Sequence, residues 1–130
     1  MRFALAVHGG PAAGQASRSA LNFAVAALAA GHEIQRVFFQ QDGVLNGSAL
    51  DVVPRDETDP AAQWAQLGRK HHIDLVLCVA SALRRGILDA SEADRHARGT
   101  GNADPAFTIS GLGQLMESAL EADRLITFGA

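Results

Sequence analysis

Short apolar runs alternate with longer stretches of helical periodicity along this chain. Phe3–Val7, Ile34–Phe39 and Ile73–Val79 are rich in β-branched or aromatic residues, and polar or glycine-containing segments bound each of them. Their length and composition predict buried strands of a parallel sheet. Residues 125–128 predict a fourth strand, and residues 107–109 are compatible with a fifth.

The segments between these runs carry helix signals. Residues 17–30 have apolar side chains at helical spacing and are followed by Gly31, which predicts a helix stop. Asp59-Pro60 predicts a helix start, because aspartate caps the first turn and proline fits its first position. Asp89 and Glu92 have the spacing of a capping box for a short helix ending near Gly99.

The last predicted helix follows Ser110, which we expect to cap it. Its apolar positions form one stripe, expected to pack on the sheet: Leu112, Leu115, Met116, Ala119 and Leu120. The alternation of strands and helices predicts an α/β fold. We expect a single domain over residues 1–130, a three-layer α/β/α arrangement with a mainly parallel four- to five-stranded sheet.

Composition narrows the function classes. The 130 residues are 48% apolar and 19% charged with a net charge of −3, so nothing favours direct binding to nucleic acid or a polybasic membrane contact. A single cysteine excludes an internal disulfide and fits a reducing compartment. The first apolar run is too short for a signal-peptide core, and none reaches membrane-spanning length. These features predict a cytoplasmic protein without membrane attachment.

Cys78 is the candidate catalytic residue. It lies near the carboxyl end of a predicted central strand, where open α/β sheets bind ligands. A helix start after it, together with Arg84 and Arg85, would lower the pKa of the thiol. The alternative is a structural role, because free cysteines are often small buried hydrophobes.

The number of cysteines restricts the chemistry. Thioredoxin-like exchange and an intramolecular peroxidase cycle both require a resolving cysteine within reach. Here no second cysteine exists. A covalent intermediate on Cys78 must therefore be resolved by a thiol of another molecule, which points to a relay.

Other site chemistries find less support, and we expect no metal and no cofactor. The five histidines, His8, His32, His71, His72 and His96, lack metal-site spacing, and the adjacent pair would diverge on a regular element. The glycine-rich segment 8–14 has neither a GxGxxG nor a GK[ST] pattern for phosphate. A Cys–His–Asp hydrolase has no supporting spacing.

The sequence allows two interpretations for each of four further polar residues. Asp42 and Asn46 either line the crevice at the sheet edge or only form the turn after the second strand. Arg84 and Arg85 either stabilise an anionic sulfur or are solvated surface charges.

The ordered set of short motifs resembles the TusD/DsrE family of sulfur-relay subunits along essentially the whole chain. The resemblance is carried by residues 1–4, 16–17, 31–33, 37–39, 42–44, Asn46, 78–80, 83–86, 109–115 and 122–124. It implies that Cys78 carries sulfane sulfur as a persulfide. Family members vary in residues 8–14, so no role is attached to them.

The resemblance also implies partners and pathways. Such a subunit works in a heterohexamer with TusB/TusC-like or DsrF/DsrH-like subunits. A TusA-like donor supplies the sulfur and a TusE/DsrC-like acceptor takes it, for tRNA 2-thiouridine synthesis or for dissimilatory sulfur oxidation. Two alternatives stay open: a flavodoxin-like module that binds a small anionic ligand, and a scaffold subunit, each with an inert Cys78.

Overall fold

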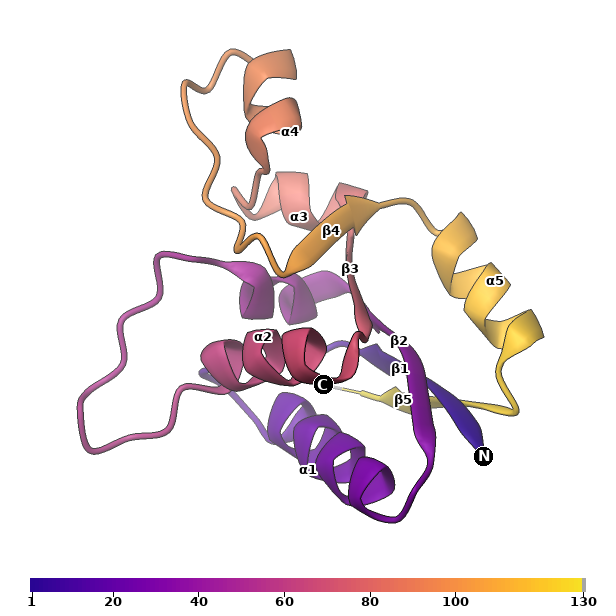
Figure 1. Cartoon of the computed structure of the whole chain (residues 1–130). Helices are drawn as coiled ribbons and strands as arrows, with labels where there is room; N and C mark the ends of the chain where they lie inside the picture. Colours follow the sequence, from indigo (N-terminus) through magenta and orange to yellow (C-terminus); the bar gives the residue numbers. More distant parts are fainter. Residues whose placement is uncertain (130) are drawn as a thin grey trace.

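The computed structural model describes residues 1–129 and contains one sheet of five parallel strands (Figure 1). The strand order is β4-β3-β2-β1-β5. The strands are β1 (Arg2–Val7), β2 (Glu33–Phe39), β3 (Asp74–Cys78), β4 (Phe107–Ser110) and β5 (Arg124–Phe128). The helices are α1 (Ala16–Ala29), the 3-10 helix η1 (Gln41–Gly47), α2 (Pro60–His71), α3 (Val79–Arg84), α4 (Ala90–Arg95) and α5 (Gly113–Glu121).

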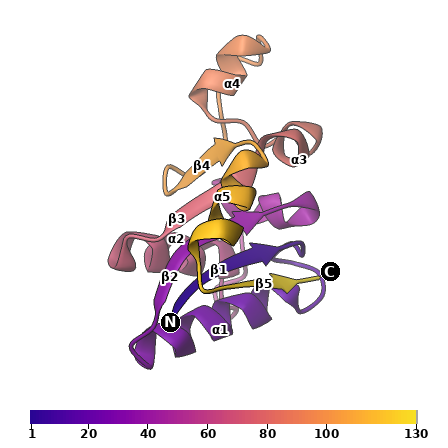
Figure 2. The same cartoon turned by 90° about the vertical axis from the view of Figure 1, so that its right-hand side faces the viewer.

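The helices lie on both faces of this sheet. α1 and α2 pack on one face, and α5 crosses the other (Figure 2). α3 and α4 lie beyond the carboxyl end of β3 (Figure 1). The predicted α/β class and the five-stranded parallel sheet are thus confirmed.

The face under α1 and α2 is packed with aromatic and aliphatic side chains. Trp64 of α2 meets Phe39 of β2 edge to face at 5.4 Å between ring centroids, and Phe39 also meets Phe107 at 5.5 Å. Phe3 and Phe23 form a similar pair at 5.2 Å. Trp64 and Phe39 are fully buried, so this face holds the main hydrophobic core.

Two of the predicted helix starts are confirmed by their caps. The Asp59 side chain accepts a hydrogen bond from the Ala62 amide at 3.2 Å, with Pro60 next in the chain. Asp89 accepts one from the Glu92 amide at 2.8 Å. The helix after Asp89 is shorter than predicted, because it ends at Arg95 and Ala97 turns into the left-handed region with a φ of 54° before Gly99.

The prediction for the last helix is wrong in its cap and in its buried face. Ser110 is the last residue of β4, where it pairs with Cys78, and α5 starts without a side-chain cap. Three residues of the expected stripe, spaced four apart, point outward: Leu112, Met116 and Leu120 are 55%, 68% and 86% exposed. We call these three residues the outer α5 stripe. Ser118 is instead the buried residue of this helix.

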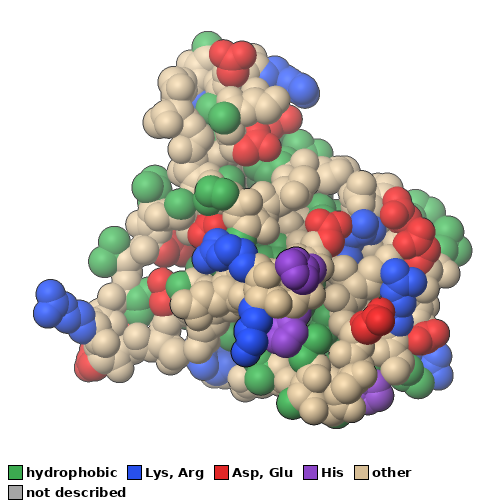
Figure 3. All heavy atoms as spheres, in the orientation of Figure 1, with side chains coloured by type: hydrophobic (Ala, Val, Ile, Leu, Met, Phe, Trp, Pro, Cys, Tyr) green, Lys and Arg blue, Asp and Glu red, His purple; other side chains and the backbone are tan. Residues whose placement is uncertain are grey.

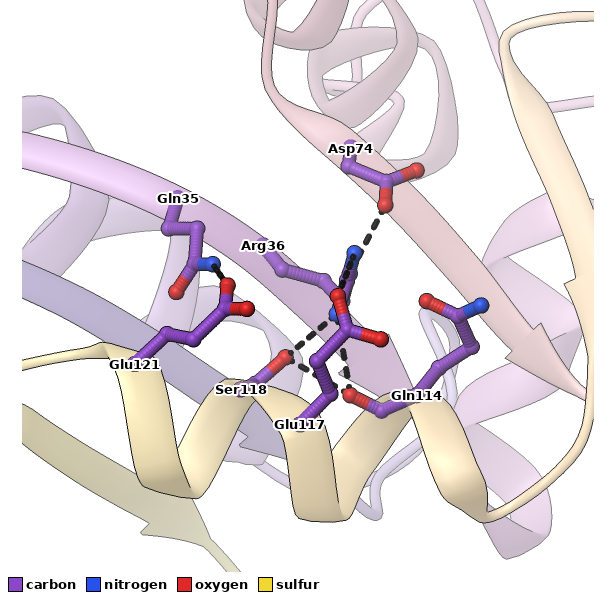
Figure 4. A network of polar contacts seen from close by, with 7 residues as sticks. All are labelled: Gln35, Arg36, Asp74, Gln114, Glu117, Ser118 and Glu121. Atoms are coloured by element: carbon purple, nitrogen blue, oxygen red, sulfur yellow. Dashed lines mark hydrogen bonds and ion pairs between the residues drawn. The ribbon is translucent and has the colours of Figure 1, made fainter.

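A buried arginine explains this orientation (Figure 4). Arg36 of β2 donates to Asp74 at 2.7 Å, to the Gln114 carbonyl at 3.0 Å and to the Ser118 hydroxyl at 2.9 Å. Its side chain is 11% exposed, so the helix turns its polar side inward to satisfy it. Burying an apolar stripe here would remove the partners that α5 supplies and leave the guanidinium with Asp74.

An irregularity in the sheet adds a second polar side chain to the same face. The register between β1 and β2 shifts after Phe3, so that Phe3 is opposite Ile34 but Ala4 is opposite Arg36. Gln35 is the extra residue. As in other β-bulges, two neighbouring side chains share one face, and Gln35 donates to Glu121 of α5 at 2.7 Å (Figure 4).

Candidate active site

Cys78 is the last residue of β3 and directly precedes α3. Side chains of a strand alternate between faces, and Asp74 of the same strand reaches Arg36 on the α5 side. Cys78 therefore faces the α5 side as well. The predicted helix after the cysteine is confirmed, although α3 has only six residues.

The thiol is free but covered. Cys78 retains 6% exposure and belongs to the hydrophobic core cluster. Ser110, the last residue of β4, pairs with Cys78, and both Ser110 and the following Gly111 are half-buried. Little of this residue is therefore accessible to a thiol of another protein in the isolated chain, since Cys78 is 6% exposed.

The segments after β2 and β3 are joined above the sheet edge. The Gln41 amide donates to the Ser81 hydroxyl at 3.0 Å. Arg85 donates to Asp42 at 2.8 Å and to the Ser81 carbonyl at 3.2 Å. Arg85 thus binds η1, and among residues 1–129 its hydrogen bonds and ion pairs do not involve the thiol. Arg84 is exposed to solvent.

Asn46 lies at the centre of a buried polar junction. Its side chain is fully buried; its oxygen accepts from Ser17 at 2.9 Å, and its nitrogen donates to the carbonyls of Gly43 and Gly9 at 2.9 and 3.2 Å. Trp64 in turn donates to the Ser17 hydroxyl at 3.2 Å. This set, the Asn46 junction, holds the first loop, η1, α1 and α2 together.

Close backbone contacts fix the same loops. A Cβ on Gly43 would collide with the Val7 carbonyl oxygen, and one on Gly9 would lie 2.7 Å from the Ala16 side chain. η1 therefore packs directly against the end of β1. The first loop, η1 and the segment after β3 therefore meet at one edge of the sheet.

A cleft of about 980 Å³ opens at this edge. The segment between η1 and α2 extends away from the body of the molecule and forms one wall (Figures 1 and 3). The first loop, residues 9–14, forms the opposite wall, and Asp42 lines the cleft between them. Cys78 is not among its lining residues, so the cleft and the thiol are separate features of one edge.

Burial and charge act on one side chain of this cleft. Partial burial raises the pKa of Asp51, and the nearby Asp59 carboxylate raises it further. Both causes disfavour the ionised form of Asp51. Asp51 and Asp59 therefore lie close enough to repel each other in their ionised forms.

The histidines are dispersed. His32 contacts the amino terminus at 2.9 Å, and His96, which directly follows α4, lies 3.3 Å from Glu92 of that helix. Within residues 1–129, no three His, Cys, Asp or Glu side chains gather in a way that would hold a metal ion. Over the same residues, no helix has the length and apolar character needed to cross a bilayer.

Comparison with known proteins places these features in a family. The profile of the DsrE/DsrF-like family matches residues 1–128. The chain belongs to this family. It is 51% identical over 129 residues to the protein named "Putative sulfurtransferase DsrE" of Allochromatium vinosum, covering 99% of both chains. It is 50% identical to "Sulfurtransferase TusD homolog" of Pseudomonas aeruginosa, covering 99% of this chain and 98% of the other.

Comparison with a solved structure also confirms the fold. The crystal structure of the ychN protein from E. coli superposes with a TM-score of 0.75 over 98% of this chain and 99% of that one, at 18% identity. At this identity the likeness concerns the fold alone. The names of the two sequence relatives support a sulfur-relay role for the family member described here.

Proposed function

We propose that this chain is a sulfurtransferase subunit that carries sulfane sulfur as a persulfide on Cys78. The observation that carries the proposal is the position of its one cysteine, at the carboxyl end of a central strand of the sheet, in a chain about half identical to proteins named sulfurtransferases. Because no other thiol is present in the sequence, each transfer step must involve a thiol of a partner.

The proposed chemistry consists of two exchanges. The Cys78 thiolate attacks the terminal sulfur of a persulfide on a TusA-like donor; a new S–S bond forms, the donor S–S bond breaks and the donor leaves as a thiolate. A thiolate of a TusE/DsrC-like acceptor then attacks the terminal sulfur on Cys78, and Cys78 leaves as the thiolate. Sulfur is transferred at each step without net oxidation or reduction, and the pKa values of attacking and leaving thiols govern the rates.

The burial of Cys78 adds a requirement to this scheme. Cys78 is only 6% exposed, so we expect partner binding to increase the access of a protein thiol to its sulfur. Once loaded, the terminal sulfur lies about 2 Å beyond the cysteine sulfur, which is the length of one S–S bond. The second exchange therefore needs a smaller opening than the first.

Assembly with related subunits is part of the proposal. The outer α5 stripe exposes three large apolar side chains on one helix face, and Figure 3 shows apolar atoms along this edge of the molecule. Such a contiguous face is typical of a protein interface. We place TusB/TusC-like or DsrF/DsrH-like subunits in a heterohexamer with this chain.

The pathway is tRNA 2-thiouridine synthesis or dissimilatory sulfur oxidation. The identities to the relatives named DsrE and TusD, 51% and 50%, are nearly equal and do not favour one pathway over the other. We place the relay in the cytoplasm, because persulfide exchange needs thiols kept reduced.

The test is sulfur loading of the chain and of Cys78→Ser. Intact-protein mass spectrometry after incubation with a persulfide donor should show a gain of one sulfur atom, about 32 Da by atomic mass, that the variant lacks. Equal unfolding curves show that the fold is retained. A serine variant that gains the same mass would refute the proposal.

The burial of the thiol favours one competing function, a scaffold subunit with an inert cysteine. In that case Cys78→Ser would assemble with its partners and the complex would transfer sulfur at the unchanged rate. Alkylation separates the two functions. A relay subunit should react faster with iodoacetamide in the assembled complex than alone, whereas an inert thiol should react slowly in both.

A further inference from the structure

The cleft between the first loop and the segment before α2 has no part in the sulfur chemistry described above. Its size and lining are nevertheless those of a binding surface. Its volume of about 980 Å³ is at the upper end of sites for small ligands. Its floor and walls are largely apolar, formed by the glycines and alanines of residues 9–14, with Leu45 and Val53. Val52, on the outer wall, is 93% exposed.

The charges around this apolar surface have one dominant sign. The lining carboxylates are Asp42, Asp51, Asp56, Glu57 and Asp59, and the one lining cation is Arg18. Asp42 is neutralised by Arg85 and Asp59 caps α2. Within the described part of the chain, Asp51, Asp56 and Glu57 form no ion pair.

An occupant must complement both properties. A positive charge near Asp51 and Asp59 would relieve the repulsion that raises the pKa of Asp51. Apolar groups would cover Val52 and Leu45. A nucleic acid carries the wrong charge, and a single metal ion would leave the apolar walls uncovered.

The position of the cleft connects it to the thiol. Asp42 lines the cleft and is bonded to Arg85, which lies at the end of the helix that starts after Cys78. A chain segment lying in the cleft therefore reaches the sheet edge at which β3 ends. Electrostatic complementarity of this kind steers and orients a partner more than it adds affinity.

We propose that the cleft binds an extended segment, carrying Lys or Arg together with apolar side chains, of the protein that donates sulfur to Cys78. The proposal rests on the sulfur relay for the identity of that protein. The chemistry of the segment follows from the cleft alone.

The first experiment measures binding of a defined probe to the full-length chain. A fluorescent eight-residue peptide alternating lysine and leucine should bind, and the same peptide with glutamate in place of lysine should not. The double variant Asp51→Asn, Glu57→Gln should weaken binding by roughly three- to tenfold, as expected for two exposed charge pairs. Asp94→Asn on α4 removes an exposed carboxylate elsewhere and should leave the affinity unchanged.

Amide chemical shifts locate the binding site. Addition of the lysine peptide should move signals of residues 10–14 and 51–54. Shifts on another face, equal binding of both peptides, or equal weakening by Asp94→Asn would overturn the proposal. Binding of spermine as tight as that of the peptide would overturn the assignment to a polypeptide.

A second measurement separates this inference from the relay itself. Cys78→Ser should bind the lysine peptide with unchanged affinity, because the thiol is not in the cleft. Saturating peptide should slow sulfur loading of the chain from a protein persulfide at least severalfold and leave loading from glutathione persulfide unchanged. Equal rates from the protein donor with and without peptide would refute the role in partner docking, whereas absence of loading from either donor would refute the relay.

Discussion

The two faces of the sheet are built on opposite principles. Under α1 and α2, aromatic rings such as Trp64 and Phe39 are fully buried and pack edge to face. Under α5, a guanidinium is buried, and the helix is held by hydrogen bonds to Arg36 while the outer α5 stripe faces solvent. The first face is complete within the chain, whereas the second leaves large apolar side chains of its helix uncovered.

This difference separates stability from association. Hydrophobic burial is the dominant favourable contribution to folding, and the first face contains most of it. The second face contributes less, because a buried ion pair loses much of its attraction to desolvation. In return, it leaves the outer α5 stripe available to another protein.

The largest effect is expected on the aromatic face. Trp64→Ala should lower the free energy of unfolding by about 3–5 kcal/mol, because it leaves a cavity beside Phe39 and deprives Ser17 of a donor. Trp64→Phe keeps a ring and should cost about 1 kcal/mol for the lost hydrogen bond. Urea denaturation measures both. A similar cost for the two variants would contradict the view that ring packing dominates this face.

An intermediate effect is expected for the buried arginine. Arg36→Met should cost about 2 kcal/mol, less than for a fully buried pair because Asp74 and Glu117 retain access to water. Hydrogen exchange should increase in α5 and stay unchanged in α1. Arg124→Met, at an exposed arginine of β5, is the matched control and should change neither. Faster exchange in α1 would show that the two faces are not independent.

The smallest effect on stability is expected for the outer α5 stripe. Met116→Ser combined with Leu120→Ser should change the free energy of unfolding by less than about 0.5 kcal/mol, because both side chains are exposed. The same variant should lose its partner subunits in native mass spectrometry. Val25→Ser, at a half-exposed apolar residue of α1, should keep them. Retention of all subunits by the double variant would place the interface elsewhere.

Local signals were sufficient to predict most of the fold. The strands are apolar runs of the right length, and Asp59-Pro60 marks a helix start whatever lies around it. The orientation of α5 was not predictable in this way. It depends on Arg36, which is 78 residues away from Gln114 along the chain, and amphipathic periodicity shows that a helix has two faces without showing which one is buried.

The candidate site was predictable only in part. The strand pattern places Cys78 at the end of β3, but its burial follows from packing that no local pattern records. Asn46 was interpreted as a turn or crevice residue. It is instead fully buried, because Ser17 and two loop carbonyls supply its partners from three separate segments. One signal in the sequence could have indicated the burial of Asn46. This polar residue follows the apolar pair Val44 and Leu45 and precedes a glycine.

The extra residue in β2 makes this strand tolerant of a change in length. Removing one residue from a regular strand moves every later side chain to the opposite face. Deleting Gln35 would instead leave Ile34 opposite Phe3 and Arg36 opposite Ala4, as they are now. Such a shortened chain should keep both packed faces and lose only the contact with Glu121, so this is a point at which the length of the protein can vary without a change of architecture.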